Sequence, residues 1–128
     1  MTFEAGQQWA YASSSELAHS RIVIGAIVEF DGGAVITCCA VTGALQKAAD
    51  GAVEHVDIPF LPIAREALAR SVTQLDGFGT LPDAFAVELE NWRLDPRGAS
   101  YFTVPFEGSL ERMIALQMAV LIDKDREP

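Results

Sequence analysis

The sequence predicts an α+β fold in which two helices cover a twisted antiparallel sheet, with a partly open SH3-like barrel as the specific variant. Three observations lead to this class. Runs of β-branched residues are joined by short connections that contain glycine, and two stretches carry apolar residues at helical spacing. The helices are also too few to serve as crossovers in a parallel sheet. With 128 residues, a single domain over residues 1–128 is expected.

The first half of the chain contains the clearest strands. Trp9 and Tyr11 lie two residues apart, as in a half-buried strand, and Asp31-Gly32-Gly33 predicts a tight turn between two β-branched runs. Proline has no N–H to donate to a strand ladder, so Pro59 is expected to end the fourth strand. The strands predicted here cover residues 7–11, 21–30, 34–41 and 54–58, with a loop or single helical turn over residues 43–51.

The second half is predicted to hold a helix, a hairpin and a final helix. Pro62 suits a helix start, and apolar residues recur at helical spacing as far as Leu75. Residues 85–90 alternate strictly between apolar and acidic or small residues, which predicts a strand paired with a return strand over residues 101–104.

The last predicted helix runs from Glu107 to about Ile122, with Ser109 as its cap. Its apolar residues recur on one stripe, so this helix is expected to face the core. The stripe consists of Leu110, Met113, Ile114, Met118 and Leu121.

Charge and composition limit the classes of function. There are 18 acidic residues against 9 Lys and Arg, which gives a formal net charge of -9. Phosphate backbones would be repelled, so nucleic acid is not expected as a partner, whereas a basic protein would be attracted. No apolar run is long enough to span a membrane and the start lacks a secretory signal pattern, so we expect a cytoplasmic protein that does not bind membranes.

Candidate catalytic residues are few. Cys38 and Cys39 are adjacent, so on a strand they point to opposite faces, which makes them poor partners for one another and poorly placed to converge on one metal ion. Cys38 or Cys39 with His55 or His19 would be one nucleophile and base pair, and His55 with Asp57, about 7 Å apart along a strand, would be an acid and base pair. Nucleotide-binding and hydrolase motifs are absent, so no cofactor and no metal are expected.

Aromatic residues give the best candidate binding site. Trp and Tyr combine a large apolar body with a polar group and are enriched at interfaces. Core filling is the competing interpretation for most of them. The predicted binding residues are Trp9, Tyr11, Trp92 and Tyr101, with Arg93 near a hairpin end framing the groove.

Several segments together resemble a group of small uncharacterised bacterial proteins. They are Gly6-Gln7-Gln8-Trp9-Ala10-Tyr11, Ser20-Arg21-Ile22-Val23-Ile24, His55-Val56-Asp57-Ile58-Pro59-Phe60 followed by Ser71-Val72, and Trp92-Arg93 before Gly98. The resemblance spans most of the chain, and its motifs are structural in type, so it implies no assigned activity. Cys38-Cys39 departs from the polar or histidine-bearing strand expected at that place.

Three classes of function follow from these observations. The first is a non-enzymatic protein-binding module, for example an acidic immunity-type inhibitor of a basic toxin enzyme. The second is a small enzyme that uses His55 with Asp57 or with a cysteine. The third is a structural homodimer formed through an unpaired strand edge.

Overall fold

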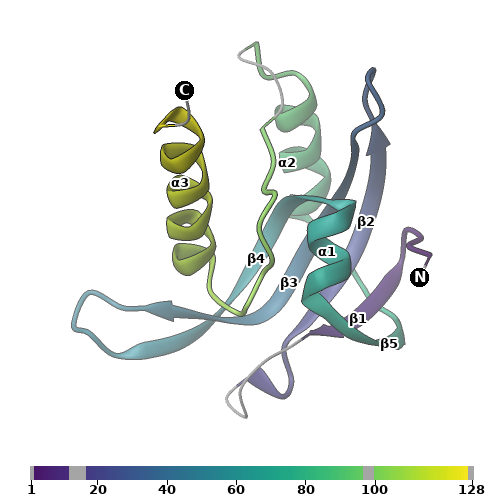
Figure 1. Cartoon of the computed structure of the whole chain (residues 1–128). Coiled ribbons are helices and arrows are strands. Elements are labelled where there is room, and N and C mark those ends of the chain that lie inside the picture. Colours follow the sequence, from purple (N-terminus) through teal and green to yellow (C-terminus); the bar gives the residue numbers. More distant parts are fainter. Residues whose placement is uncertain (1, 12–16, 97–99, 127–128) are drawn as a thin grey trace.

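The structure, a computed structural model, describes residues 2–11, 17–96 and 100–126 (Figure 1). Within these residues it is an α+β fold with one open antiparallel sheet of five strands, ordered β4-β3-β2-β1-β5, and three helices. The elements are β1 (Gln7–Tyr11), β2 (Arg21–Glu29), β3 (Val35–Lys47), β4 (Val53–Ala64), α1 (Arg65–Ser71), β5 (Val72–Phe78), α2 (Ala84–Arg93) and α3 (Leu110–Arg126).

The predicted hairpin of β2 and β3 is confirmed. Gly32 and Gly33 adopt φ angles of 97° and 92° at its turn, a conformation that glycine reaches without steric cost. β3 continues beyond the predicted end at residue 41 as far as Lys47, so the expected loop is part of a long hairpin with β4. Register shifts next to Val41 mark irregularities of the kind that bend strands, and Figure 1 shows the distal part of this hairpin turning away from the sheet.

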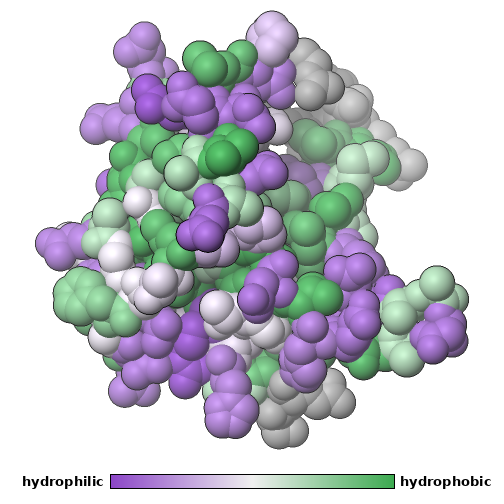
Figure 2. All heavy atoms as spheres, turned by 180° about the vertical axis from the view of Figure 1, so that it is seen from behind, coloured by the Kyte–Doolittle hydropathy of each residue, from purple (hydrophilic) through white to green (hydrophobic). Residues whose placement is uncertain are grey.

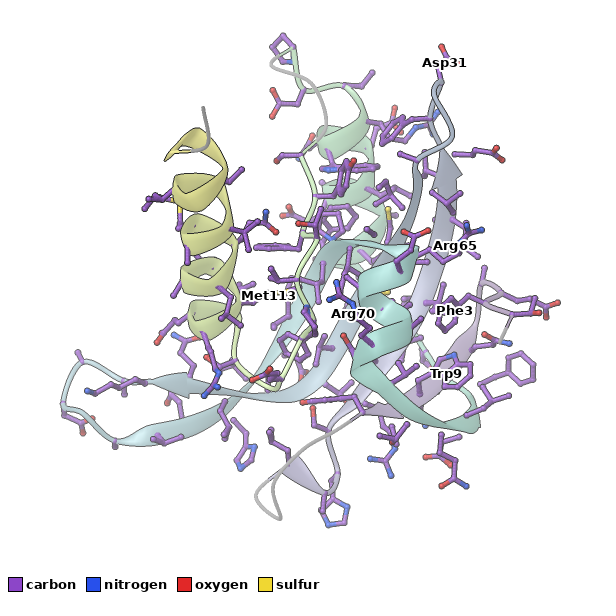
Figure 3. The ribbon with its side chains drawn as sticks, in the orientation of Figure 1. Phe3, Trp9, Asp31, Arg65, Arg70 and Met113 are labelled. Carbon is purple, nitrogen blue, oxygen red and sulfur yellow. The ribbon has the colours of Figure 1, made fainter. Side chains whose placement is uncertain are left out.

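The two faces of the sheet carry separate hydrophobic clusters, because side chains alternate along each strand. One of them, here called the front cluster, contains Cys39 and is covered by α1, whose Leu68 is fully buried. The other, here called the back cluster, lies on the opposite face of the sheet. It contains Cys38 and is covered by α2 through Phe85. The prediction that the two cysteines point to opposite faces is confirmed. Figure 3 shows Phe3 beside Trp9 at the front cluster, with their ring centroids 5.4 Å apart.

The helix predicted from Pro62 to Leu75 is wrong at both ends. β4 runs through Pro59 and Pro62 to Ala64, α1 occupies only residues 65–71, and Val72 opens β5. β4 is one of the two edge strands of the sheet, where a missing N–H can face away from the neighbouring strand. β-branched Val72 and Thr73 favour the extended conformation, and β5 pairs with β1.

The second predicted hairpin is also wrong. Residues 85–90 belong to helix α2, because Phe85, Leu89 and Trp92 recur at i, i+4 and i+7 and Ala86, Glu88 and Glu90 between them are good helix formers. Residues 101–104 are not a strand paired with them. Phe102 instead makes one isolated parallel bridge with Ile63 at the outer edge of β4.

The final helix is confirmed, beginning at Leu110, and the Ser109 hydroxyl accepts a hydrogen bond from the Arg112 N–H at 3.3 Å as its cap. The expectation that its whole stripe faces the core is wrong. Met113 is buried and Leu110 half-buried, whereas Ile114, Met118 and Leu121 are exposed. The sheet is open rather than barrel-like, with helices on both faces.

Candidate functional site

A groove of about 670 Å³ lies between α2 and α3. Its base comes from the outer edge of β4 and from the extended segment after residue 99. Aromatic and polar side chains share the lining, which consists of Phe60, Pro62, Glu88, Asn91, Trp92, Asp95, Ser100, Tyr101, Phe102, Gln117 and Leu121. Two of the predicted binding residues, Trp92 and Tyr101, therefore lie in one groove.

The α2 wall of the groove is positioned by packing against the back of the sheet. Phe85 is 4% exposed and its ring lies over Gly25 of β2, where a side chain would collide with it. This contact fixes the inner face of α2. Glu88, Asn91 and Trp92, spaced three and four residues apart, then share the face that lines the groove.

The Trp92 indole is held on several sides. Its ring centroid lies 5.8 Å from that of Phe30 and 5.8 Å from that of Phe60, in tilted arrangements. Its Nε1–H donates a hydrogen bond to the Ser100 carbonyl oxygen at 2.6 Å. The indole therefore ties α2 to the segment that carries Tyr101, and it remains half-buried at the groove.

The α3 wall is attached mainly through its first two turns. The Gln117 side-chain oxygen accepts hydrogen bonds from the Thr103 N–H at 2.7 Å and from the Thr103 hydroxyl at 3.1 Å. Beyond this anchor α3 stands away from the sheet (Figure 1). Residues 113–122 contain no charged residue, and large apolar side chains among them are 36–54% exposed, namely Ile114, Leu116, Met118, Val120, Leu121 and Ile122.

Figure 2, seen from behind, shows hydrophobic side chains reaching the surface on the side of the molecule that carries α3. We refer to the groove and the exposed apolar side chains of α3 together as the α2–α3 surface.

Trp9 and Tyr11 are core residues, contrary to the prediction that they bind a partner. They are 7% and 4% exposed and belong to the front cluster, away from the groove. The Trp9 Nε1–H donates to the Gln7 side-chain oxygen at 3.1 Å, and the Tyr11 hydroxyl shares a 2.7 Å hydrogen bond with Ser20. Burial raises the pKa of Tyr11. The Gln-x-Trp-x-Tyr pattern therefore organises the core.

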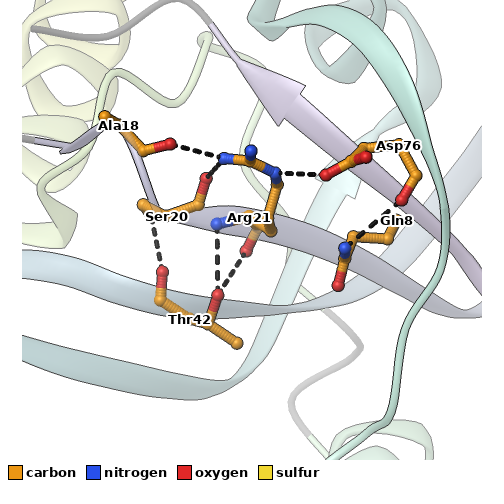
Figure 4. A network of polar contacts seen from close by, with 6 residues as sticks. All are labelled: Gln8, Ala18, Ser20, Arg21, Thr42 and Asp76. Carbon is orange, nitrogen blue, oxygen red and sulfur yellow. Dashed lines mark hydrogen bonds and ion pairs between the residues drawn. The ribbon is translucent and has the colours of Figure 1, made fainter. Parts of the chain in front are cut away.

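Arg93 does not line the groove. It is exposed and lies 4.0 Å from the Glu90 carboxylate, one helical turn away on α2. The more strongly bound arginine is Arg21, which donates to Asp76 at 2.8 Å and to the carbonyl oxygens of Ala18 and Ser20 (Figure 4). This network joins the start of β2 to the edge strand β5.

The His55 and Asp57 side chains bind the same glycine instead of one another. His55 Nδ1 lies 3.0 Å from the Gly43 carbonyl oxygen, and the Asp57 carboxylate accepts the Gly43 N–H at 2.9 Å. Gly43 has a φ angle of 67°, so both side chains brace the bend of the β3–β4 hairpin. Their predicted role as an acid and base pair has no support in this arrangement.

The thiols lie far from His55. Cys39 pairs with Leu61 in the sheet, and His55 pairs with Leu45, six residues further along β3, or about 20 Å at the usual rise per residue. Burial raises the pKa of Cys38 to about 12 and also raises that of Cys39. A thiol is a poor nucleophile under these conditions, since the thiolate is the reactive form.

The two glutamates of the stretch over residues 85–90 do not form a catalytic pair either. Glu88 and Glu90 lie two residues apart on a helix, so they point to different sides, and only Glu88 lines the groove. Among the described residues, no group of three or more His, Cys, Asp or Glu could hold a metal ion. None of the helices in the described part of the chain is long and apolar enough to cross a membrane.

Comparison with known proteins gave no match to a family model, to a curated protein or to a solved structure. The resemblance to small bacterial proteins therefore stays a prediction.

Sequence reasoning missed most residues of the groove, among them Phe60, Glu88, Gln117 and Leu121. Phe60 lies just beyond the predicted end of the fourth strand at residue 58, and Glu88 lies in the stretch over residues 85–90 that was predicted as a strand. One signal could have indicated α3 as a surface element. The uncharged stretch over residues 113–122 is apolar around most of the helical circumference. Packing of one side of this helix against the core therefore leaves apolar side chains on its other sides exposed.

Proposed function

We propose that the chain is a cytoplasmic, non-enzymatic protein-binding module that contacts its partner through the α2–α3 surface. The observation that carries this proposal is the exposure of large apolar side chains along α3 beside an aromatic groove. Contiguous exposed apolar surface with a polar rim is typical of interaction sites.

The charge of the chain favours a basic partner. A net charge of -9 would speed the encounter with a positively charged protein and disfavour acidic ones. An immunity-type inhibitor of a basic toxin enzyme is one concrete form of such a module. The groove would supply the apolar contact area and the surrounding acidic surface would supply orientation.

A homodimer is the second candidate, and one observation favours it. Two copies with a net charge of -9 each repel one another except where charge is scarce, and residues 113–122 of α3 provide such a region. The sequence led us to expect self-association through an unpaired strand edge, but the edge strand β5 suits this role less well than α3. Register shifts interrupt the pairing of β5 with β1, and irregular edges resist further pairing.

Site-specific photo-crosslinking tests the proposal. A photoreactive amino acid would replace Met118 on α3, and a matched control would replace Thr73, an exposed residue of β5. Irradiation in cells of the source organism should give adducts from position 118 and few from position 73. An adduct of twice the chain mass would identify the homodimer, and equal yields from both positions would contradict a specific α2–α3 surface.

A further inference from the structure

We propose that the groove between α2 and α3 binds a lysine or arginine side chain of a partner protein segment. The aromatic rings of Phe60, Trp92 and Tyr101 would contact the cationic group, and the Glu88 carboxylate would pair with it. This inference rests on the proposed function, because it names the chemistry that the α2–α3 surface recognises.

The aromatic lining is suited to a cation. The face of an aromatic ring carries partial negative charge, and tryptophan is the strongest partner for an ammonium or guanidinium group. Phe60 and Trp92 stand at an interplanar angle of 56°, so their rings do not stack flat on one another. The indole N–H of Trp92 is already satisfied by Ser100, which leaves ring contact as the interaction that Trp92 can offer a ligand.

The charges at the groove also favour a basic occupant. Two of the lining residues, Glu88 and Asp95, are acidic, and none of the described lining residues is basic. Glu88 is exposed and makes no ion pair within the described part of the chain, whereas Arg93 on the same helix lies beside Glu90. A cationic side chain would therefore find an available carboxylate next to the aromatic rings.

The surroundings favour a peptide segment over a small free cation. Lysine and arginine bury an apolar stem while keeping the charged end in polar contact. Leu121 lines the groove and Met118 is exposed on the same helix, so apolar neighbours of a basic residue would find contact area along α3. A small cation would leave this surface uncovered.

Peptide titration followed by NMR tests the inference. The first probe is a short peptide of alternating leucine and arginine, and the second replaces each arginine with citrulline, which is uncharged and nearly isosteric. The indole N–H signal of Trp92 reports the groove, and that of buried Trp9 serves as an internal reference. The arginine peptide should bind about tenfold more tightly than the citrulline peptide and should shift only the Trp92 signal.

Two variants with the same change in net charge separate the groove from general attraction. Glu88→Gln should weaken arginine-peptide binding about fivefold, because the removed charge lines the groove. Glu90→Gln should change it by less than about twofold, since Glu90 is not a lining residue. Trp92→Leu should also weaken arginine-peptide binding. If Trp92→Leu folds poorly, the comparison of Glu88→Gln with Glu90→Gln still tests the inference.

Three results would overturn the inference. They are equal affinity for the two peptides, equal effects of the two glutamine variants, or no shift of the Trp92 signal with either peptide. None of these decides the proposed function, which is judged separately by crosslinking from position 118. An α2–α3 surface that crosslinks a partner but binds both peptides equally would be an apolar docking site without selection for charge.

Discussion

Gly25 shows how one residue determines where a helix lies. A Cβ atom at this position would stand 2.3 Å from Phe85 Cζ, so only glycine lets the ring lie on the β2 backbone. The ring centroid of Phe85 also lies 5.7 Å from that of Phe60, a groove residue, so the Phe85 ring has little room to move. The absence of a side chain at Gly25 therefore sets the position of α2, and through α2 the position of the groove wall.

The first prediction concerns this contact. Gly25→Ala should lower the free energy of unfolding by about 1–3 kcal/mol, because the added methyl group overfills the site. Urea denaturation would measure it. In a Phe85→Ala background the same substitution should cost much less, since the colliding ring is gone. An equal cost in both backgrounds would show that the effect comes from the strand backbone instead.

The second prediction concerns the thiols. Burial raises the pKa of Cys38 to about 12 and also raises that of Cys39, so the reactive thiolate is scarce at neutral pH, and neither residue is exposed. Iodoacetamide at pH 8 should label neither cysteine in the folded protein and both in urea. Thr73→Cys provides an exposed control thiol. Rapid labelling of Cys38 in the folded state would contradict this prediction and would support a nucleophilic role for the Cys38 thiol.

At the scale of elements, the sequence predicted the first half of the chain more reliably than the second. β1 and the β2–β3 hairpin were correct because their residues alternate in burial and their turn has the required glycines. Residues 85–90 were misassigned because their short apolar and polar alternation also fits a helix when Trp92 is included. The contact of Phe85 with Gly25, which is distant in sequence, then holds the helix against the sheet.

Only a small part of the candidate site could be predicted from the sequence. Trp92 and Tyr101 were named from residue type alone, and they line the groove. Trp9 and Tyr11 have the same residue types but are buried, because β1 lies between two other strands and the front cluster covers it. Residue type indicates what can bind, whereas strand order decides what is exposed.

The third prediction concerns the attachment of α3. The Gln117 side chain holds the backbone and hydroxyl of Thr103, so Gln117→Ala should cost about 1 kcal/mol in stability and speed amide hydrogen exchange along α3. Exchange measured by mass spectrometry would show this. Gln74→Ala is the control, because the Gln74 side chain makes no hydrogen bond to the described residues. Equal protection of α3 in both variants would contradict an anchoring role.

At the scale of the whole molecule, polar contacts tie together strands that are not neighbours. Arg21 at the start of β2 pairs with Asp76 of β5, although β1 lies between these strands. The Gln8 side chain of β1 donates to the Asp76 carbonyl oxygen, and Thr42 of β3 bonds the Arg21 backbone (Figure 4). The network therefore spans four strands and secures β5 at the edge of the sheet.

The fourth prediction follows from the charge state of this network. The Arg21 guanidinium, by its hydrogen bond and its charge, holds the pKa of Asp76 below the ordinary value of 3.8. A carboxylate whose pKa is lower in the folded state stabilises the fold above the ordinary pKa, and this contribution is lost as the pH falls through the lowered value. Asp76→Asn should therefore be less stable than the wild type at pH 7, and the difference should shrink below about pH 4.

A matched variant separates this local effect from the general charge of the chain. Any Asp→Asn change reduces a net charge of -9 and so relieves repulsion in the same way. Asp31 lies at the exposed tip of the β2–β3 hairpin (Figure 3) and makes no ion pair with the residues described. Asp31→Asn should thus leave stability at pH 7 unchanged or slightly higher. If urea denaturation gave both variants the same dependence on pH, the network would contribute nothing beyond net charge, and β5 would be held by its backbone pairing with β1 alone.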